Sequence, residues 1–156
     1  MPDIDYLLLV SRWLHIAAAI TAVGGAMYAR FAAAPSIKEQ LDGPARTALQ
    51  DAIRRRWAKF VHASIAVLLL TGSLNFVLLA LPPKIKPLPY HPIFGVKFLL
   101  ALAVFVIGTA LVGRSPAFAK LRERNLHWLN VLLALAGIIV LISGLLSQVR
   151  IAQIGG

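Results

Sequence analysis

The sequence contains no cysteine and little charge. Only 14% of its 156 residues are charged, 59% are hydrophobic, and the mean hydropathy is +0.78. Without cysteine the chain has no disulfides, thiolate metal sites, iron–sulfur clusters or covalently attached c-type haem. A soluble domain carries about 25% charged residues. This composition therefore excludes a water-soluble enzyme and predicts a single integral membrane domain over residues 1–156.

Carboxylates are also missing from the long apolar stretches. The six acidic residues all lie near the N-terminus or between these stretches. A hydrolase needs a buried acid–base pair and a carboxylate proton relay needs buried acids, so both classes are disfavoured. Copper handling is disfavoured as well, because Cu(I) prefers sulfur ligands and the chain offers only Met1 and Met27.

Four apolar segments are each long enough to cross a bilayer as a helix, which takes about 20 residues. They cover residues 6–31, 60–81, 93–112 and 127–148. Short connections between such segments favour antiparallel neighbours. We therefore expect an all-α protein, an integral membrane antiparallel four-helix bundle.

Basic residues are distributed unevenly between the two sides of these spans. The loops after the first and third spans share one side and carry eleven of the sixteen Lys and Arg residues. The eleven are Arg30, Lys38, Arg46, Arg54, Arg55, Arg56, Lys59, Arg114, Lys120, Arg122 and Arg124. Cations concentrate on the cytoplasmic side. The pattern therefore predicts a bacterial inner-membrane protein with both termini outside, and it explains the net charge of +10 without nucleic acid.

The two longest connections have contrasting compositions. Residues 33–59 predict a turn at residues 42–44, followed by an amphipathic helix that runs into the second span. The arginines at 54–56 in that helix suit lipid phosphates. The connection LPPKIKPLPYHP, residues 81–92, is rich in proline, so we expect it to be extended and stiff.

Four histidines provide the main chemical signal. Antiparallel threading places His15 and His91 toward the outside, and His62 and His127 toward the cytoplasm. A b-type haem takes axial imidazole ligands from facing helices of a bundle. The pattern therefore predicts two bis-histidine haems b, with all four histidines as iron ligands. Each histidine can alternatively be a partly solvated residue at the membrane–water interface. This interpretation fits His15 least, because His15 lies about two turns inside an apolar helix.

Small residues accompany the histidines. Ala18, Ala22 and Ala26 share a helical face with His15, which suits either a flat ring or close helix packing. Glycines also lie ten residues after three of the histidines. Ten residues rise about 15 Å, half the apolar thickness of a bilayer. Each glycine is therefore expected at the depth of the opposite histidine pair, where it makes room for a haem that other helices ligate. These glycines are Gly25, Gly72 and Gly137.

Other polar residues suit the edges of a haem. Lys97, about one turn into the third span, is expected either to pair with a haem propionate near the outer histidines or to reach the interface. On the cytoplasmic side, Arg30 and Lys59 are likewise expected either to pair with a haem propionate or to reach the interface. Asn75 and Asn130 are expected to form hydrogen bonds between helices.

The first span resembles a known family. The run RWLHIAAAITAVGGAMYARF is similar to the opening helix of HemJ-type haem-binding protoporphyrinogen oxidases and of the CopD-type copper-resistance membrane domain. These families place a histidine, a glycine ten residues later, an aromatic residue and an arginine along that helix. In this sequence those positions are His15, Gly25, Tyr28 and Arg30. The run FGVKFLLALAVFVIG resembles their lysine-bearing third helix through Lys97, and LHWLNVLLALAGIIVLI resembles their fourth helix through Trp128 and Asn130.

The sequence departs from the HemJ-type pattern at three places. The arginine of the first helix follows a proline in that family and lies one residue further along, whereas Ala29 precedes Arg30 here. Ala22 and Val23 stand where a tryptophan usually precedes the glycine of the first helix, and Gly95 stands where the third helix usually has a histidine. The resemblance thus implies a haem-compatible four-helix membrane fold, with His15 as the ligand it supports best.

Four functions stay open at this point. A b-type cytochrome for transmembrane electron transfer is favoured, because it needs only iron ligands and a dry pocket. The alternatives are a haem-dependent porphyrinogen oxidase, a copper-handling protein, and a cofactor-free structural or assembly subunit. A cytochrome without a soluble domain exchanges electrons with a redox partner protein or a quinone. Membership of a larger complex and homo-oligomerisation both stay open.

Overall fold

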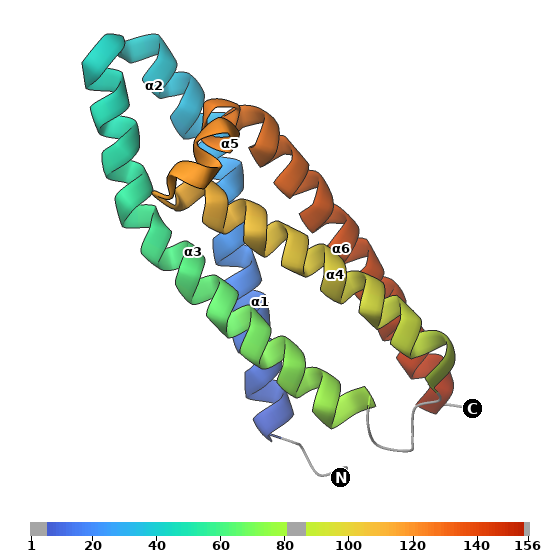
Figure 1. Cartoon of the computed structure of the whole chain (residues 1–156). Coiled ribbons are helices and arrows are strands. Elements are labelled where there is room, and N and C mark those ends of the chain that lie inside the picture. The colour runs from blue at the N-terminus through green and yellow to red at the C-terminus, as the bar shows by residue number, and fades with distance from the viewer. Residues whose placement is uncertain (1–5, 81–86, 155–156) are drawn as a thin grey trace.

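The computed structural model describes residues 6–80 and 87–154, and the regular elements within them are all helical (Figure 1). The long helices are α1 (Tyr6–Tyr28), α3 (Gly43–Ala80), α4 (Pro87–Val112) and α6 (Asn125–Ile154). The short elements are the π-helix η1 (Ala29–Ala33), α2 (Ala34–Gln40), the 3₁₀ helix η2 (Pro116–Phe118) and α5 (Ala119–Glu123). The expected all-α fold is confirmed.

Four helices are long and apolar enough to cross a membrane, namely α1 with its continuation, α3, α4 and α6. They form a ring in which α1 packs against α3, α3 against α4, α4 against α6, and α6 against α1. Figure 1 shows α2 and α5 at one end of the bundle, and the start of α1 and the end of α6 at the other. We call these the basic end and the terminal end. The two loops with most of the cations therefore share one end, as expected.

The first helix does not stop where its apolar run stops. It continues through η1 into α2, and within η1 the N–H of Ala34 donates to the carbonyl of Ala29, five residues earlier. Pro35 follows at once. Proline has no N–H, and its ring opposes the carbonyl four residues before it, so a widened turn ahead of Pro35 relieves that conflict.

The second span and the helix before it form one continuous element. The predicted turn is present, because Leu41 and Asp42 separate α2 from α3, and Gly43 adopts a left-handed φ of 55°. Glycine tolerates that conformation without a steric cost. The 38-residue α3 then runs from the amphipathic segment into the apolar span, as the sequence predicts.

The proline-rich connection differs from the prediction. Residues 87–92 are helical rather than extended, while residues 81–86 lie outside the described part of the chain. Proline suits the first turn of a helix, where its missing N–H has no intrahelical partner to lose. Pro92 lies inside α4 and forgoes one backbone hydrogen bond there. In consequence His91 lies within α4 and not in a loop before it.

Buried side chains gather in two clusters at opposite ends of the bundle. The cluster toward the basic end consists of Ala26, Ile107, Leu111, Leu129 and Leu132. The cluster toward the terminal end centres on Tyr90 and Leu146, with Phe76 and Phe94 packed against them. A cavity lies within the ring, and Ala26, Leu111, Leu129 and Leu132 of the first cluster form part of its wall.

Candidate functional site

A cavity of about 1340 Å³ lies at the centre of the ring, with walls from α1, α3, α4 and α6. Its walls are mainly apolar, including Ala19, Ala22, Leu68 and Ala101. Two of the four histidines line it, His15 and His127, and so do two of the three cations expected beside a haem. Those cations are Lys97 and Arg30. A cavity with mainly apolar walls and a few polar groups is the ordinary form of a cofactor site.

A hydrogen-bond relay orients the imidazole of His15. Its Nδ1 lies 2.8 Å from Oγ1 of Thr71 on the neighbouring α3. The Thr71 hydroxyl donates its single proton to the carbonyl of Val67, at 2.6 Å. That hydroxyl must therefore accept a proton from His15, which puts the imidazole proton on Nδ1. Nε2 is then unprotonated and carries the lone pair that a metal ligand needs.

Gly72 gives the His15 ring its place beside α3. A Cβ atom at Gly72 would lie 3.4 Å from Cε1 of His15. Gly72 thus lies at the depth of the histidine of the opposite pair, as the spacing of ten residues predicts. It makes room for the imidazole itself.

The other two glycines of this spacing differ from Gly72. A Cβ at Gly25 would overlap the indole ring of Trp57, so Gly25 admits a tryptophan of α3. Gly137 has open space beside its Cα atom. Close approach of α1 and α3 at small residues is the expected way for membrane helices to pack.

Lys97 shares the cavity with His15. It lies on α4 and is partly buried. A cation in an apolar wall is costly unless it meets an anion or reaches water. This position therefore suits a ligand that carries a carboxylate.

His91 belongs to an aromatic cluster at the terminal end. Its ring meets the ring of Phe76 edge-on, with centroids 5.6 Å apart, and also lies edge-on to Tyr90. Phe76 stacks on Phe94 with centroids 4.3 Å apart, and Phe94 in turn lines the cavity. His91 itself is not part of the cavity lining.

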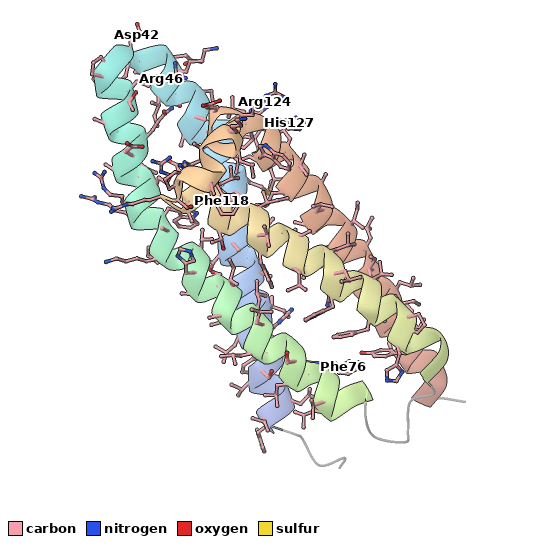
Figure 2. All side chains as sticks on the ribbon, in the orientation of Figure 1. Asp42, Arg46, Phe76, Phe118, Arg124 and His127 are labelled. Atoms are coloured by element: carbon pink, nitrogen blue, oxygen red, sulfur yellow. The ribbon has the colours of Figure 1, made fainter. Side chains whose placement is uncertain are left out.

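The two histidines expected toward the cytoplasm differ in their surroundings. His62 is exposed and lies outside the cavity lining. His127 lies at the basic end, where its ring is edge-on to Trp128 at 5.7 Å, and it lines the cavity (Figure 2). The cavity thus holds one histidine from each expected pair.

A hydrogen bond links the first and fourth spans at the basic end. Nε of Arg30 donates to Oδ1 of Asn130 at 2.7 Å, so Asn130 forms the expected bond between helices. The guanidinium of Arg30 also lies over the ring of Phe31. Asn75 differs, because its Oδ1 is buried without a partner among the described residues. Lys59 is exposed and is not part of the lining.

His15 and His127 lie far apart along the bundle. Fifteen residues separate His15 from Arg30, a rise of about 22 Å on a helix. Arg30 is level with Asn130, which is less than one turn from His127. The two cavity-lining histidines therefore cannot ligate the same iron.

Thr71 is the site residue that sequence reasoning missed. A signal was available, because Ser64, Thr71 and Asn75 recur at spacings of seven and four along an otherwise apolar span. Such a polar stripe faces one neighbour on a helix. Linking it to His15 requires knowing that α1 and α3 are adjacent and in which register.

No protein-family model, curated protein or solved structure matches the chain. Within the described residues, no group of three or more His, Cys, Asp or Glu is placed to hold a metal ion. A metal bound only by protein side chains needs several such ligands. A porphyrin supplies four nitrogen ligands to its iron, so the protein needs to supply only one or two further ligands.

Proposed function

We propose that the chain is a b-type haem protein of the membrane, with Nε2 of His15 as an iron ligand. One observation carries this proposal: the hydroxyl of Thr71 directs the free lone pair to Nε2 of a histidine that lines a large apolar cavity. Metal-ligating histidines characteristically donate their other ring N–H in this way.

The residues around His15 fit a haem. The alanine-lined face of α1 gives a flat apolar wall, and Lys97 supplies positive charge for a carboxylate-bearing edge of the ring. Attachment is non-covalent because there is no cysteine. When bound, haem supplies one-electron redox chemistry, while His15 orients it and the apolar wall excludes water.

We propose transmembrane electron transfer as the activity. The basic end lies in the cytoplasm of a bacterial cell and both termini lie outside, in accord with the cation distribution. The electrons pass to or from a partner protein or a quinone. A second haem at the basic end would use His127, since His62 lies outside the lining. The similarity to HemJ-type and CopD-type proteins supports the same haem-compatible bundle.

A haem-dependent oxidase is the second candidate. The observation in its favour is that His91, the expected second ligand of the outer haem, is not part of the cavity lining. With His15 as the only protein ligand, the iron keeps an open position for a substrate. Carbon monoxide binding to the reduced protein separates the two candidates, since iron with two histidine ligands has no free position.

Haem content of purified histidine variants tests the proposal. His15→Ala is expected to lose the haem that is next to Lys97. His62→Ala is the matched control, because it removes an imidazole outside the cavity and leaves that haem in place. Retention of full haem by His15→Ala would overturn the proposal. Loss of half the haem in His62→Ala would establish a second haem ligated there.

A further inference from the structure

The basic end of the cavity has a concentration of positive charge that the haem at His15 does not use. Seven cations line this end, against two carboxylates, Asp51 and Glu123. The cations are Arg30, Lys38, Arg46, Arg54, Arg56, Arg122 and Arg124. They come from η1, α2, α3 and the α5 region, so several elements bring them to one opening. Figure 2 shows Arg46 and Arg124 at this end of the bundle.

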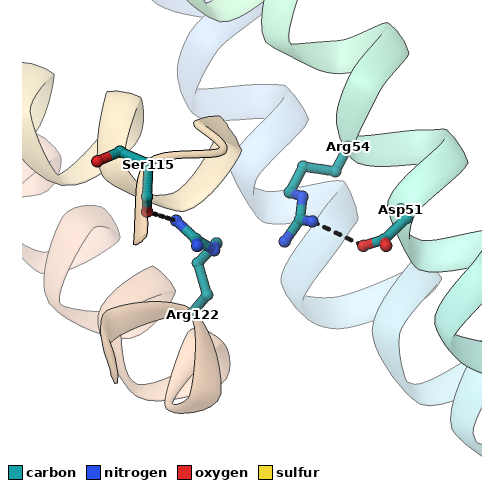
Figure 3. Close-up of polar contacts among 4 residues, drawn as sticks. All are labelled: Asp51, Arg54, Ser115 and Arg122. Carbon is teal, nitrogen blue, oxygen red and sulfur yellow. Dashed lines mark hydrogen bonds and ion pairs between the residues drawn. The ribbon is translucent and has the colours of Figure 1, made fainter. Parts of the chain in front are cut away.

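Two of these arginines come from different elements and line the same cavity. In Figure 3 the side chain of Arg54 extends from α3, and that of Arg122 extends from α5. Arg54 donates to Asp51 at 2.7 Å, and Arg122 donates to the carbonyl of Ser115 at 2.9 Å. The carbonyl is neutral and does not offset the charge of Arg122. The pair therefore keeps a net positive charge, which suits a phosphate held by two guanidinium groups.

The cavity continues from these arginines as an apolar passage. Trp57 and Phe60, which follow Arg54 along α3, stack with ring centroids 5.3 Å apart, and both line it. Deeper in, the walls are Ile65, Val104 and Phe105. An anion without an apolar tail would leave this passage empty, while an apolar molecule without an anion would leave the arginines unmatched.

We propose that the basic end of the cavity binds an anionic phospholipid from the adjacent leaflet. Arg54 and Arg122 hold the phosphate, and an acyl chain occupies the apolar passage. This differs from general attraction of a basic loop to lipid. The structure separates neighbours that the sequence treats alike, because Arg54 and Arg56 line the cavity and Arg55 does not.

Lipid retention by the purified full chain in detergent tests this site. Native mass spectrometry with phosphatidylglycerol, phosphatidylcholine or glycerol phosphate as probe measures binding. Phosphatidylglycerol is expected to bind at one per chain, at least tenfold more tightly than either of the others. Equal binding of phosphatidylcholine overturns the role of the arginines. Equal binding of glycerol phosphate overturns the role of the passage.

A charge-matched pair of double variants locates the site. Arg54→Gln with Arg122→Gln is expected to weaken phosphatidylglycerol binding at least tenfold. Arg55→Gln with Arg114→Gln removes two exposed charges outside the lining and is expected to change it less than twofold. Equal loss in both variants would reduce the effect to general surface charge and overturn the proposal.

The haem absorbance of the same samples distinguishes this proposal from the proposed function. The first double variant is expected to keep the haem at His15. If this variant instead lost haem and kept its bound lipid, the arginines would hold a second haem, and the lipid site would be overturned. Protein that retains phosphatidylglycerol but never binds haem would overturn only the haem function.

Discussion

Thr71 Oγ1 lies 2.8 Å from Nδ1 of His15 and joins the second spanning helix to the first. Because the same hydroxyl donates to the carbonyl of Val67, the bond has one direction, from the imidazole to threonine. The tautomer of His15 is thus set by α3, not by its own helix.

Replacing Thr71 by valine keeps the shape of the side chain and removes the acceptor. We expect haem affinity to fall about 10- to 100-fold, the usual cost of losing such a partner of a ligating histidine. Haem titration followed at the Soret band measures this. Thr71→Ser should restore most of the affinity, and Thr21→Val, which alters a threonine outside the cavity lining, should have no effect. Unchanged affinity in Thr71→Val would show that the relay does not orient the ligand.

A larger side chain at Gly72 should displace the imidazole. Because a Cβ at this position already lies 3.4 Å from Cε1 of His15, the further atoms of leucine have no room beside the ring. We expect Gly72→Leu to abolish haem binding. Gly137→Leu, at the equivalent distance after another histidine, meets open space and should bind haem normally. Haem-to-protein ratios after reconstitution compare the two variants.

Gly25 and Gly24 are neighbours with opposite tolerance of a methyl group. Gly25→Ala places its Cβ in the indole ring of Trp57, whereas Gly24→Ala meets open space. Overpacking costs about 1–3 kcal/mol, so only Gly25→Ala should lower the unfolding temperature in detergent. Adding Trp57→Leu to Gly25→Ala should recover part of the loss. Equal unfolding temperatures for the two single variants would contradict the packing of α1 on α3.

The helical elements were largely predictable because long apolar runs have few structural solutions in a bilayer. The turn before Gly43 was predictable for a similar reason, since glycine beside proline punctuates a helical pattern. The start of α4 was not. Proline carries opposite meanings in an extended loop and in the first turn of a helix, and composition alone does not distinguish them.

Part of the candidate site was predictable, since His15, His127, Lys97 and Arg30 all line the cavity. His15 stands out because an ionisable group inside an apolar helix is costly. The different surroundings of His62 and His127 depend on the rotation of their helices about their own axes, which histidine positions along the chain do not reveal. The role of Thr71 depends on helix pairing and register, so it required the structure.

The orientation of the bundle is testable at Ser36, which is exposed in α2 at the basic end. A cysteine introduced there is the only one in the chain. The cation distribution predicts that a membrane-impermeant thiol reagent labels Ser36→Cys in inverted vesicles and not in intact cells. Labelling in intact cells would reverse the proposed topology.

The measurement that tests the haem proposal most directly is the visible absorption spectrum of the purified protein, oxidised and then reduced with dithionite. The proposal predicts a Soret band and, on reduction, an α band from haem that acidified solvent extracts completely. A sharp, split α band marks iron with two histidine ligands and supports electron transfer. A monodisperse, helical protein with no Soret absorbance, even after incubation with haem, would contradict the proposed function.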